Sequence, residues 1–263
     1  MCPNCRAFIT TDDKICPYCQ TEVAPRAIDR RSPPDALGGL IPHGRFATTM
    51  ILLVNTGIYI AMMLHHSQAF GGAVGMDMDG KTLEVFGANF PGGEWWRLIT
   101  AGFLHGGLLH ILMNSWVLFD LGPQVDEAYG TPRFLAFYSL ANVTGFLASS
   151  YFNHFSVGAS AAICGLIGAM LALHTRDRSS YASAMRRQYI QWVIYLLIFG
   201  LLVPNVDNAA HIGGFAGGFA VAFVAGTPRY SEAVETFWKI AAGVALAITA
   251  YAFFRMYMQL SAA

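Results

Sequence analysis

Seven apolar stretches separated by short polar connections constrain the fold of this chain more than any other feature. They cover residues 46–64, 108–125, 132–152, 158–174, 189–203, 208–225 and 237–258. Several approach or exceed the roughly 20 residues that a helix needs to cross the hydrocarbon core of a bilayer. The composition agrees, because 55% of the residues are hydrophobic and only 12% are charged, which is more apolar than a soluble domain requires. We therefore expect an all-α polytopic protein embedded in a lipid bilayer.

The positive charges predict how this protein is oriented in its membrane. If the N-terminus is inside, 13 of the 16 lysines and arginines lie in cytoplasmic segments, and only Lys81, Arg97 and Arg255 lie outside. Such an excess of positive charge marks the cytoplasmic side. We predict a multi-pass protein of a plasma or inner membrane, with a cytoplasmic N-terminus and, after seven crossings, an external C-terminus. The formal net charge of zero gives no basis for a nucleic-acid partner.

Four cysteines near the N-terminus form two CxxC pairs separated by ten residues, and they are Cys2, Cys5, Cys16 and Cys19. Thiolates at this spacing bind a tetrahedral Zn²⁺, which supplies folding energy that so short a segment cannot obtain from a core. In an oxidising compartment the same cysteines could form disulfides. The segment resembles small zinc ribbons at the termini of bacterial membrane proteins. We predict a structural zinc ribbon over residues 1–24, which could contact a cytoplasmic partner, and a linker over residues 25–45.

Polar side chains inside the apolar stretches are functional candidates, because such groups are costly in a membrane. His110 and Asn114 are four residues apart and share one helical face, as do His211, Gly214 and Gly218. Ser160 begins a helix whose small residues allow another helix to approach closely; they are Ala161, Gly165, Gly168 and Ala172. Taken singly, each histidine and the asparagine would be interpreted as a polar contact between helices, and the serine as such a contact or as a helix cap.

The positions of these polar groups favour catalysis over separate structural roles. Each follows an outside connection by a few residues, so all of them are expected at one depth, just below the outer surface. Acyl transfer needs a nucleophile, a base within hydrogen-bond reach and donors directed at the developing oxyanion. Ser160 and His211 supply the first two. His110 and Asn114, together with the Ser160 amide, supply the donors.

The sequence resembles the rhomboid intramembrane serine proteases in three motifs that follow one another along the chain. They are His105-Gly-Gly-Leu-Leu-His110-Ile-Leu-Met-Asn114, Gly158-Ala-Ser160, and Ala210-His211-Ile-Gly-Gly214-xxx-Gly218, and Trp96-Arg97 matches a further pair. The resemblance implies a six-helix protease core over residues 46–226 around a water-filled cavity, with residues 227–263 as an additional transmembrane helix. It also implies a Ser160–His211 dyad, oxyanion donors at His110 and Asn114, and transmembrane protein substrates cleaved near the outer membrane boundary. No cofactor takes part in such catalysis.

Three residues depart from the family pattern. Ala161 stands where a glycine is usual, Cys164 stands in place of an aromatic residue, and Asp126 stands where a glutamate is frequent. These departures bear on rate and substrate preference, because none of them removes a catalytic group. The alternatives are a rhomboid-like pseudoprotease that binds membrane clients without proteolysis, and a transporter or channel. A transporter would predict internal repeats, and no internal repeat is evident in the sequence.

Overall fold

The structure is a computed structural model that describes residues 5, 15–21, 45–70, 76–89, 92–175, 177–226 and 231–262. The chain divides into two compact units, Met1–Phe46 and Ala47–Ala263. The finer division into ribbon, linker, six-helix core and additional helix stays a prediction. The described residues contain helices and isolated β-bridges but no β-strand, so the predicted all-α class is confirmed for them.

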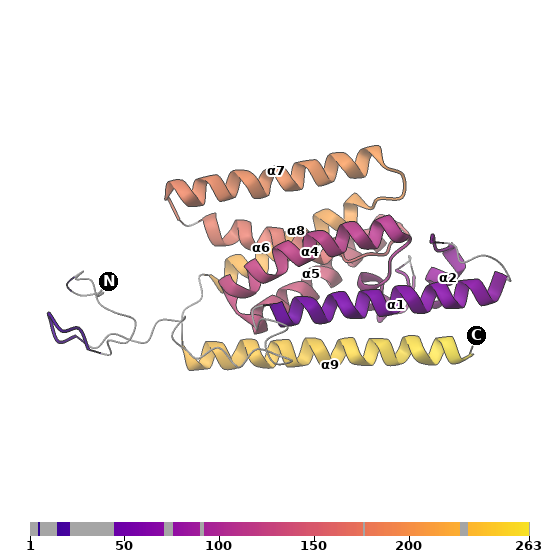
Figure 1. Cartoon of the computed structure of the whole chain (residues 1–263), viewed down its shortest axis with the longest axis horizontal. Helices are drawn as coiled ribbons and strands as arrows, with labels where there is room; N and C mark the ends of the chain where they lie inside the picture. The colour runs from indigo at the N-terminus through magenta and orange to yellow at the C-terminus, as the bar shows by residue number, and fades with distance from the viewer. Residues whose placement is uncertain are drawn as a thin grey trace. The chain divides into compact units, whose positions relative to one another are not determined.

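The second unit consists of helices of very different lengths (Figure 1). The long ones are α1 (Phe46–Phe70), α4 (Leu108–Tyr129), α5 (Thr131–Tyr151), α6 (Ser160–Thr175), α7 (Ser180–Leu202), α8 (Asn208–Ala225) and α9 (Glu232–Ala262). Between α1 and α4 lie the short helices α2 (Gly80–Val85), α3 (Arg97–Thr100) and the 3₁₀ turn η4 (Ala101–Phe103). Each apolar stretch of the sequence therefore corresponds to one long helix.

The helix α7 begins nine residues before the apolar stretch predicted at 189–203. The reason is a cap, because the Ser179 hydroxyl accepts a hydrogen bond of 3.1 Å from the amide of Ala182. A serine in this position satisfies an amide that the helix itself leaves unpaired. The polar residues that follow the cap are therefore helical, although hydropathy alone places them in a connection.

Three helices in the described part of the chain are long and apolar enough to cross a membrane by length and composition. They are Phe46–Ser67 of α1, the whole of α8, and α9, while the apolar α6 is shorter. The others carry charged side chains, such as Asp120, Asp126 and Glu127 in α4. The chain is thus an integral membrane protein with candidate spanning helices, and the count of seven crossings stays a prediction.

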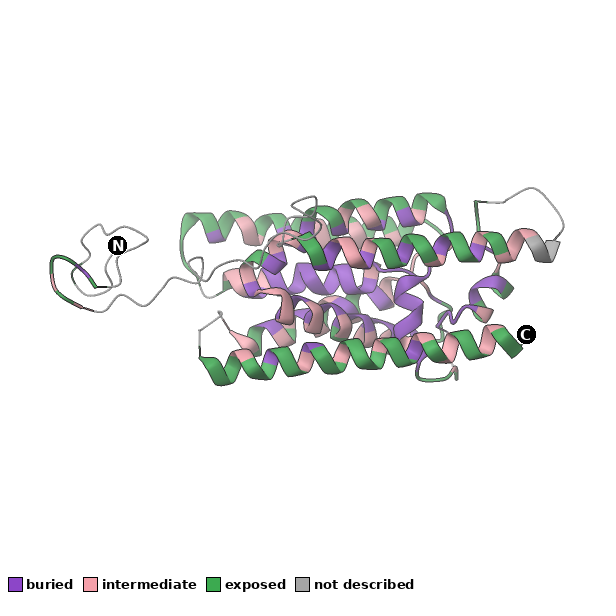
Figure 2. Cartoon of the chain, turned by 60° about the horizontal axis from the view of Figure 1, so that its bottom comes forward, coloured by how far each residue is buried: buried purple, intermediate pink, exposed green. Residues whose placement is uncertain are grey.

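The helix α6 lies inside the bundle, where it packs against α4, α5, α7 and α8. Figure 2 shows buried residues in the interior of the bundle and exposed residues along its outer faces. The helices α6 and α8 meet backbone to backbone. A Cβ at Gly214 would lie 2.0 Å from the carbonyl oxygen of Ala161, and one at Gly218 would lie 2.1 Å from that of Gly165. Only residues without a side chain allow this approach, which holds α8 directly against the helix of Ser160.

Candidate active site

Ser160 and His211 face each other across the contact between α6 and α8. The Oγ of Ser160 lies 2.9 Å from the Nε2 of His211, which is within hydrogen-bond distance. Ser160 is half-buried, whereas only 6% of the His211 surface is exposed. When Nε2 accepts the hydroxyl proton, the neutral imidazole carries its own proton on Nδ1. This geometry is what a general base requires to activate a serine.

Within the described part of the chain, the Nδ1 of His211 has no hydrogen-bond partner. A third residue that orients the base, as in a Ser-His-Asp triad, is therefore not seen there. The position of His211 instead comes from the start of α8, where the Asp207 carboxylate accepts hydrogen bonds from the amides of Ala209 and Ala210. The packing of α8 on α6 and the cap at Asp207 together determine where the imidazole lies.

Asp207 itself is held in place by a histidine from the connection between α5 and α6. The Nδ1 of His154 lies 2.8 Å from the Oδ1 of Asp207. Burial alone would raise the pKa of the Asp207 carboxyl, but hydrogen bonds that include those from His154 and the Ala210 amide lower it overall. The cap consequently stays ionised, and a negative charge at a helix N-terminus stabilises the helix.

His110 lies beside the serine, and the backbone of Gly158 makes room for it. Gly158 has a φ of +125°, and a Cβ at this position would lie 2.6 Å from the Nε2 of His110 and 3.7 Å from the Ser160 hydroxyl. The amide of Gly106 donates to the Nδ1 of His110 over 3.4 Å. Because Nδ1 accepts, the proton of a neutral ring is on Nε2, on the side of Gly158 and Ser160. The ring thus presents a donor to the site.

Asn114 lies one turn further along α4 and is not in hydrogen-bond contact with the dyad. Only 7% of its surface is exposed, and its amide donates to the carbonyl oxygen of His110 over 2.9 Å. The structure therefore brings together three of the four predicted side chains, Ser160, His211 and His110. In this state the fourth supports the helix that carries His110.

The first turns of three helices meet at the serine, where the sequence led us to expect only a common depth. Ser160 is the first residue of α6, His110 is the third of α4 and His211 is the fourth of α8. Helix N-termini carry partial positive charge and amides that the helix itself leaves unpaired, although in α8 the Asp207 carboxylate already binds those of Ala209 and Ala210. Their convergence favours an anion at this point, which is where a tetrahedral intermediate would develop its negative charge.

Two of the departures from the family pattern occupy tightly packed positions beside the serine. A Cβ at Gly145 of α5 would lie 2.6 Å from the methyl group of Ala161, so these two residues fill the contact between α5 and α6. Cys164 is 3% exposed and lies one turn after Ser160 on α6. The third, Asp126, accepts a hydrogen bond of 2.8 Å from the Thr131 hydroxyl at the junction of α4 and α5.

Three of the four predicted zinc ligands are described, and Cys2 lies outside the described residues. The ligand sulfurs of Cys5, Cys16 and Cys19 all lie within 4.8 Å of one another, and those of Cys5 and Cys16 are 3.7 Å apart. Zinc–sulfur bonds of about 2.3 Å at tetrahedral angles place two sulfurs about 3.8 Å apart. The spacing of the three described cysteines is therefore compatible with a shared zinc site.

The sequence of this chain is similar to a known protein family and to several of its members. The Rhomboid domain family model matches residues 92–228, just over half of the chain. Rhomboid protease GluP of Bacillus subtilis (strain 168) is 40% identical over 154 residues, which are 57% of this chain and 30% of GluP. RHOMBOID-like protein 4 of Arabidopsis thaliana is 38% identical over 136 residues, which are 51% of this chain and 34% of that protein.

A shorter relative is covered to a larger extent. Putative rhomboid protease YdcA of Bacillus subtilis (strain 168) is 30% identical over 146 residues, which are 54% of this chain and 73% of YdcA. By contrast, the matched region spans about a third of the length of GluP and of RHOMBOID-like protein 4. Residues 92–228, which the Rhomboid domain family model matches, contain all the residues of the candidate active site.

Proposed function

The chain belongs to the rhomboid family, and on that premise we propose that it is an intramembrane serine endopeptidase. The observation that carries the proposal is the 2.9 Å distance between the Ser160 hydroxyl and the His211 Nε2. A lone buried histidine or a lone serine is explained by packing. A serine and an imidazole in hydrogen-bond contact, at a point where the N-termini of three helices lie close together, are suited to acyl transfer.

In the proposed reaction, His211 Nε2 takes the hydroxyl proton while Ser160 Oγ attacks the scissile carbonyl carbon. The carbonyl oxygen becomes an oxyanion, which the His110 Nε2–H and the Ser160 amide stabilise together with the helix N-termini. The peptide C–N bond then breaks as the imidazolium returns its proton to the leaving amine. His211 then takes a proton from water, which attacks the acyl carbon; the bond between that carbon and Ser160 Oγ breaks, the imidazolium returns the proton to Oγ, and the carboxylate product leaves.

We propose transmembrane protein segments as substrates, cleaved near the outer membrane boundary, because the dyad lies in the first turns of its helices rather than at their middle. We also propose that the membrane domain consists of six core helices and the additional α9, and that the N-terminus is cytoplasmic and the C-terminus external. Zn²⁺ bound by Cys2, Cys5, Cys16 and Cys19 would stabilise the fold of the N-terminal unit and take no part in the chemistry.

Reconstitution of the full chain in liposomes tests this function. The preparation is incubated with a panel of tagged single-span proteins and, separately, with a fluorophosphonate that forms an ester with an activated serine. We expect fragments cut near the outer boundary and covalent labelling at Ser160. A protein that binds the single-span proteins but neither cleaves them nor reacts with the probe is a pseudoprotease, and that result would refute the proposal.

Loss of the His110 imidazole should slow the chemical step. We expect His110→Ala to lower kcat by about 10²- to 10³-fold with little change in KM, which is the usual cost of removing one oxyanion donor. His174→Gln is the matched control, because His174 lies at the other end of α6, about 21 Å from Ser160 at 1.5 Å per residue. Steady-state cleavage of a fluorogenic transmembrane substrate provides the measurement. Equal rates for the two variants would contradict the role assigned to His110.

Zinc content tests the N-terminal site independently of proteolysis. We expect about one Zn²⁺ per purified full chain by atomic emission, and a large loss of it in Cys16→Ser, because a structural site needs its full set of thiolates. Cys164→Ala is the control, since this cysteine is buried in the helical bundle. Retention of zinc in Cys16→Ser, or its loss in the control, would contradict the site.

A further inference from the structure

The described residues between α1 and α4 hold the loop that leads to Ser160. We call residues 76–89 and 92–107 the connecting segment. Asn89 and Ser156 form an antiparallel pair, in which the Asn89 amide donates to the Ser156 carbonyl over 3.1 Å and the Ser156 amide donates back over 2.9 Å. The Gly158 amide donates to the carbonyl oxygen of Ala101 over 2.9 Å. The backbone two residues before Ser160 is therefore attached to η4.

The same connecting segment holds the start of the helix that carries His110. The amide of Met78 donates to the carbonyl oxygen of Gly106 over 2.9 Å, and the amide of Leu108 donates to that of Met76 over 3.1 Å. Gly106 is the residue whose amide contacts the His110 ring. Movement of the connecting segment would therefore displace both Ser160 and His110.

The C-terminal end of α9 is hydrogen-bonded to this segment through the side chain of Gln259. Its Oε1 accepts a hydrogen bond of 2.8 Å from the Nη2 of Arg97 in α3. Its Nε2 lies 3.0 Å from the carbonyl oxygen of Val85 and 3.3 Å from that of Glu84, at the end of α2. One amide therefore joins α2, α3 and α9.

Arg97 makes this junction rigid, because only 4% of its surface is exposed and a buried charge must be well paired. Its Nε lies 2.6 Å from the Glu94 carboxylate, and its Nη1 donates to the carbonyl oxygen of Glu84 over 2.7 Å. The Arg97 side chain also lowers the pKa of the Glu94 carboxyl. Gln259 and Arg97 thus share Glu84 as an acceptor.

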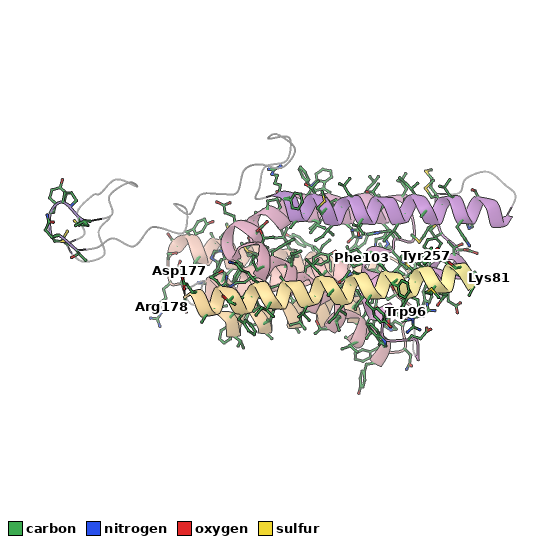
Figure 3. The ribbon with its side chains drawn as sticks, turned by 90° about the horizontal axis from the view of Figure 1, so that it is seen from below. Lys81, Trp96, Phe103, Asp177, Arg178 and Tyr257 are labelled. Carbon is green, nitrogen blue, oxygen red and sulfur yellow. The ribbon has the colours of Figure 1, made fainter. Side chains whose placement is uncertain are left out.

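Two aromatic contacts reinforce the attachment of α9. Tyr251 stacks on Trp95 with ring centroids 5.9 Å apart, and Phe253 meets Phe103 of η4 edge to face at 5.0 Å. Figure 3 shows the C-terminal half of α9, where Tyr257 is labelled, alongside Phe103 and Trp96. The contacts made by α9 therefore extend to η4, which accepts the hydrogen bond from Gly158.

We propose that α9 is a positioning element for catalysis, and that Gln259 is a residue through which α9 holds the connecting segment, and hence Ser160 and His110, in place. This inference rests on the proposed function and goes beyond it, because Gln259 touches none of the reacting groups. It assigns the additional helix a role in the rate of the chemical step.

The test is the reaction of the fluorophosphonate with Ser160 in the full chain in liposomes, followed over time. A purely structural residue would change the final labelled fraction, which counts folded sites, but not the rate constant of those sites. A positioning residue changes the rate constant and leaves the final fraction. We expect Gln259→Leu to lower the rate constant about 10- to 100-fold, since small misplacements of catalytic groups have effects of this size.

Matched variants separate the contacts of Gln259. Ser261→Ala, two residues away, removes a hydroxyl whose hydrogen bond among the described residues is to the Tyr257 carbonyl oxygen within α9, and it should react like wild type. Gln259→Glu can still accept from Arg97 but cannot donate to the two carbonyl groups, so we expect an intermediate rate. If Gln259→Leu does not fold, the rate constant of Gln259→Glu decides the test in its place.

The inference would be overturned if the folded sites of the deciding variant react with a rate constant within twofold of wild type. This holds whatever fraction of the sites is labelled. That result leaves the proposed function intact, because wild type would still react. Failure of wild type itself to react with the probe or to cleave substrate would refute the proposed function instead.

Discussion

Replacement of Ser160 by alanine is expected to abolish cleavage while the protein remains folded. The variant lacks the oxygen that forms the acyl-enzyme, and His211 and the oxyanion donors alone cannot replace a nucleophile. Removal of the nucleophile from a serine protease lowers kcat by several orders of magnitude, on the order of 10⁶ in a well-studied case. The fold should tolerate the change, because Ser160 is half-buried and alanine is well suited to a helix.

The measurement is the rate of fragment formation from a tagged single-span protein in liposomes, with the thermal unfolding midpoint recorded for the same preparation. Ser139→Ala is the matched control, because Ser139 lies on α5 in the layer that contacts α9, away from the dyad. We expect it to cleave at the wild-type rate. Cleavage by Ser160→Ala at a normal rate would show that the activity has another source and would end the assignment of the dyad.

Introduction of valine at Gly214 is expected to have the largest effect on stability. A Cβ there would lie 2.0 Å from the Ala161 carbonyl oxygen and 2.7 Å from its carbonyl carbon. Both are backbone atoms, so no rotamer change can relieve the overlap, and α8 must move away from α6. We expect a loss of about 3 kcal/mol or more in the free energy of unfolding, at the upper end of overpacking costs.

The same substitution should also abolish activity, because Gly214 lies on α8 less than one turn after His211. Displacement of α8 would lengthen the 2.9 Å contact between His211 and Ser160. Gly243→Val is the matched control, since a Cβ at Gly243 of α9 meets nothing within 4 Å. The thermal unfolding midpoint and the labelled fraction of Ser160 measure the two effects. A Gly214→Val protein as stable as Gly243→Val would contradict the close contact of α6 with α8.

Much of the candidate site could be predicted because its chemistry is expressed in local patterns. The spacing of His211, Gly214 and Gly218 indicated a helix that brings a histidine and a bare backbone to the same neighbour. In the structure Gly214 and Gly218 lie against α6, as that spacing indicated. Asn114 shows where such reasoning ends, because spacing gives a face of a helix but not the partner of its amide. In the structure that partner is the carbonyl oxygen of His110.

The seven apolar stretches, the N-terminal cysteine pairs and the candidate catalytic groups could all be predicted from the sequence, since hydropathy, helical periodicity and functional groups are properties of neighbouring residues. Only the tertiary structure decided which faces meet, which nitrogen of His110 faces the site, and what holds α9 in place. Those outcomes depend on groups far apart in the chain, such as Arg97 and Gln259, which are separated by 162 positions. No local pattern specifies such a pair, because the geometry of each partner is set by the packing of the helices between them.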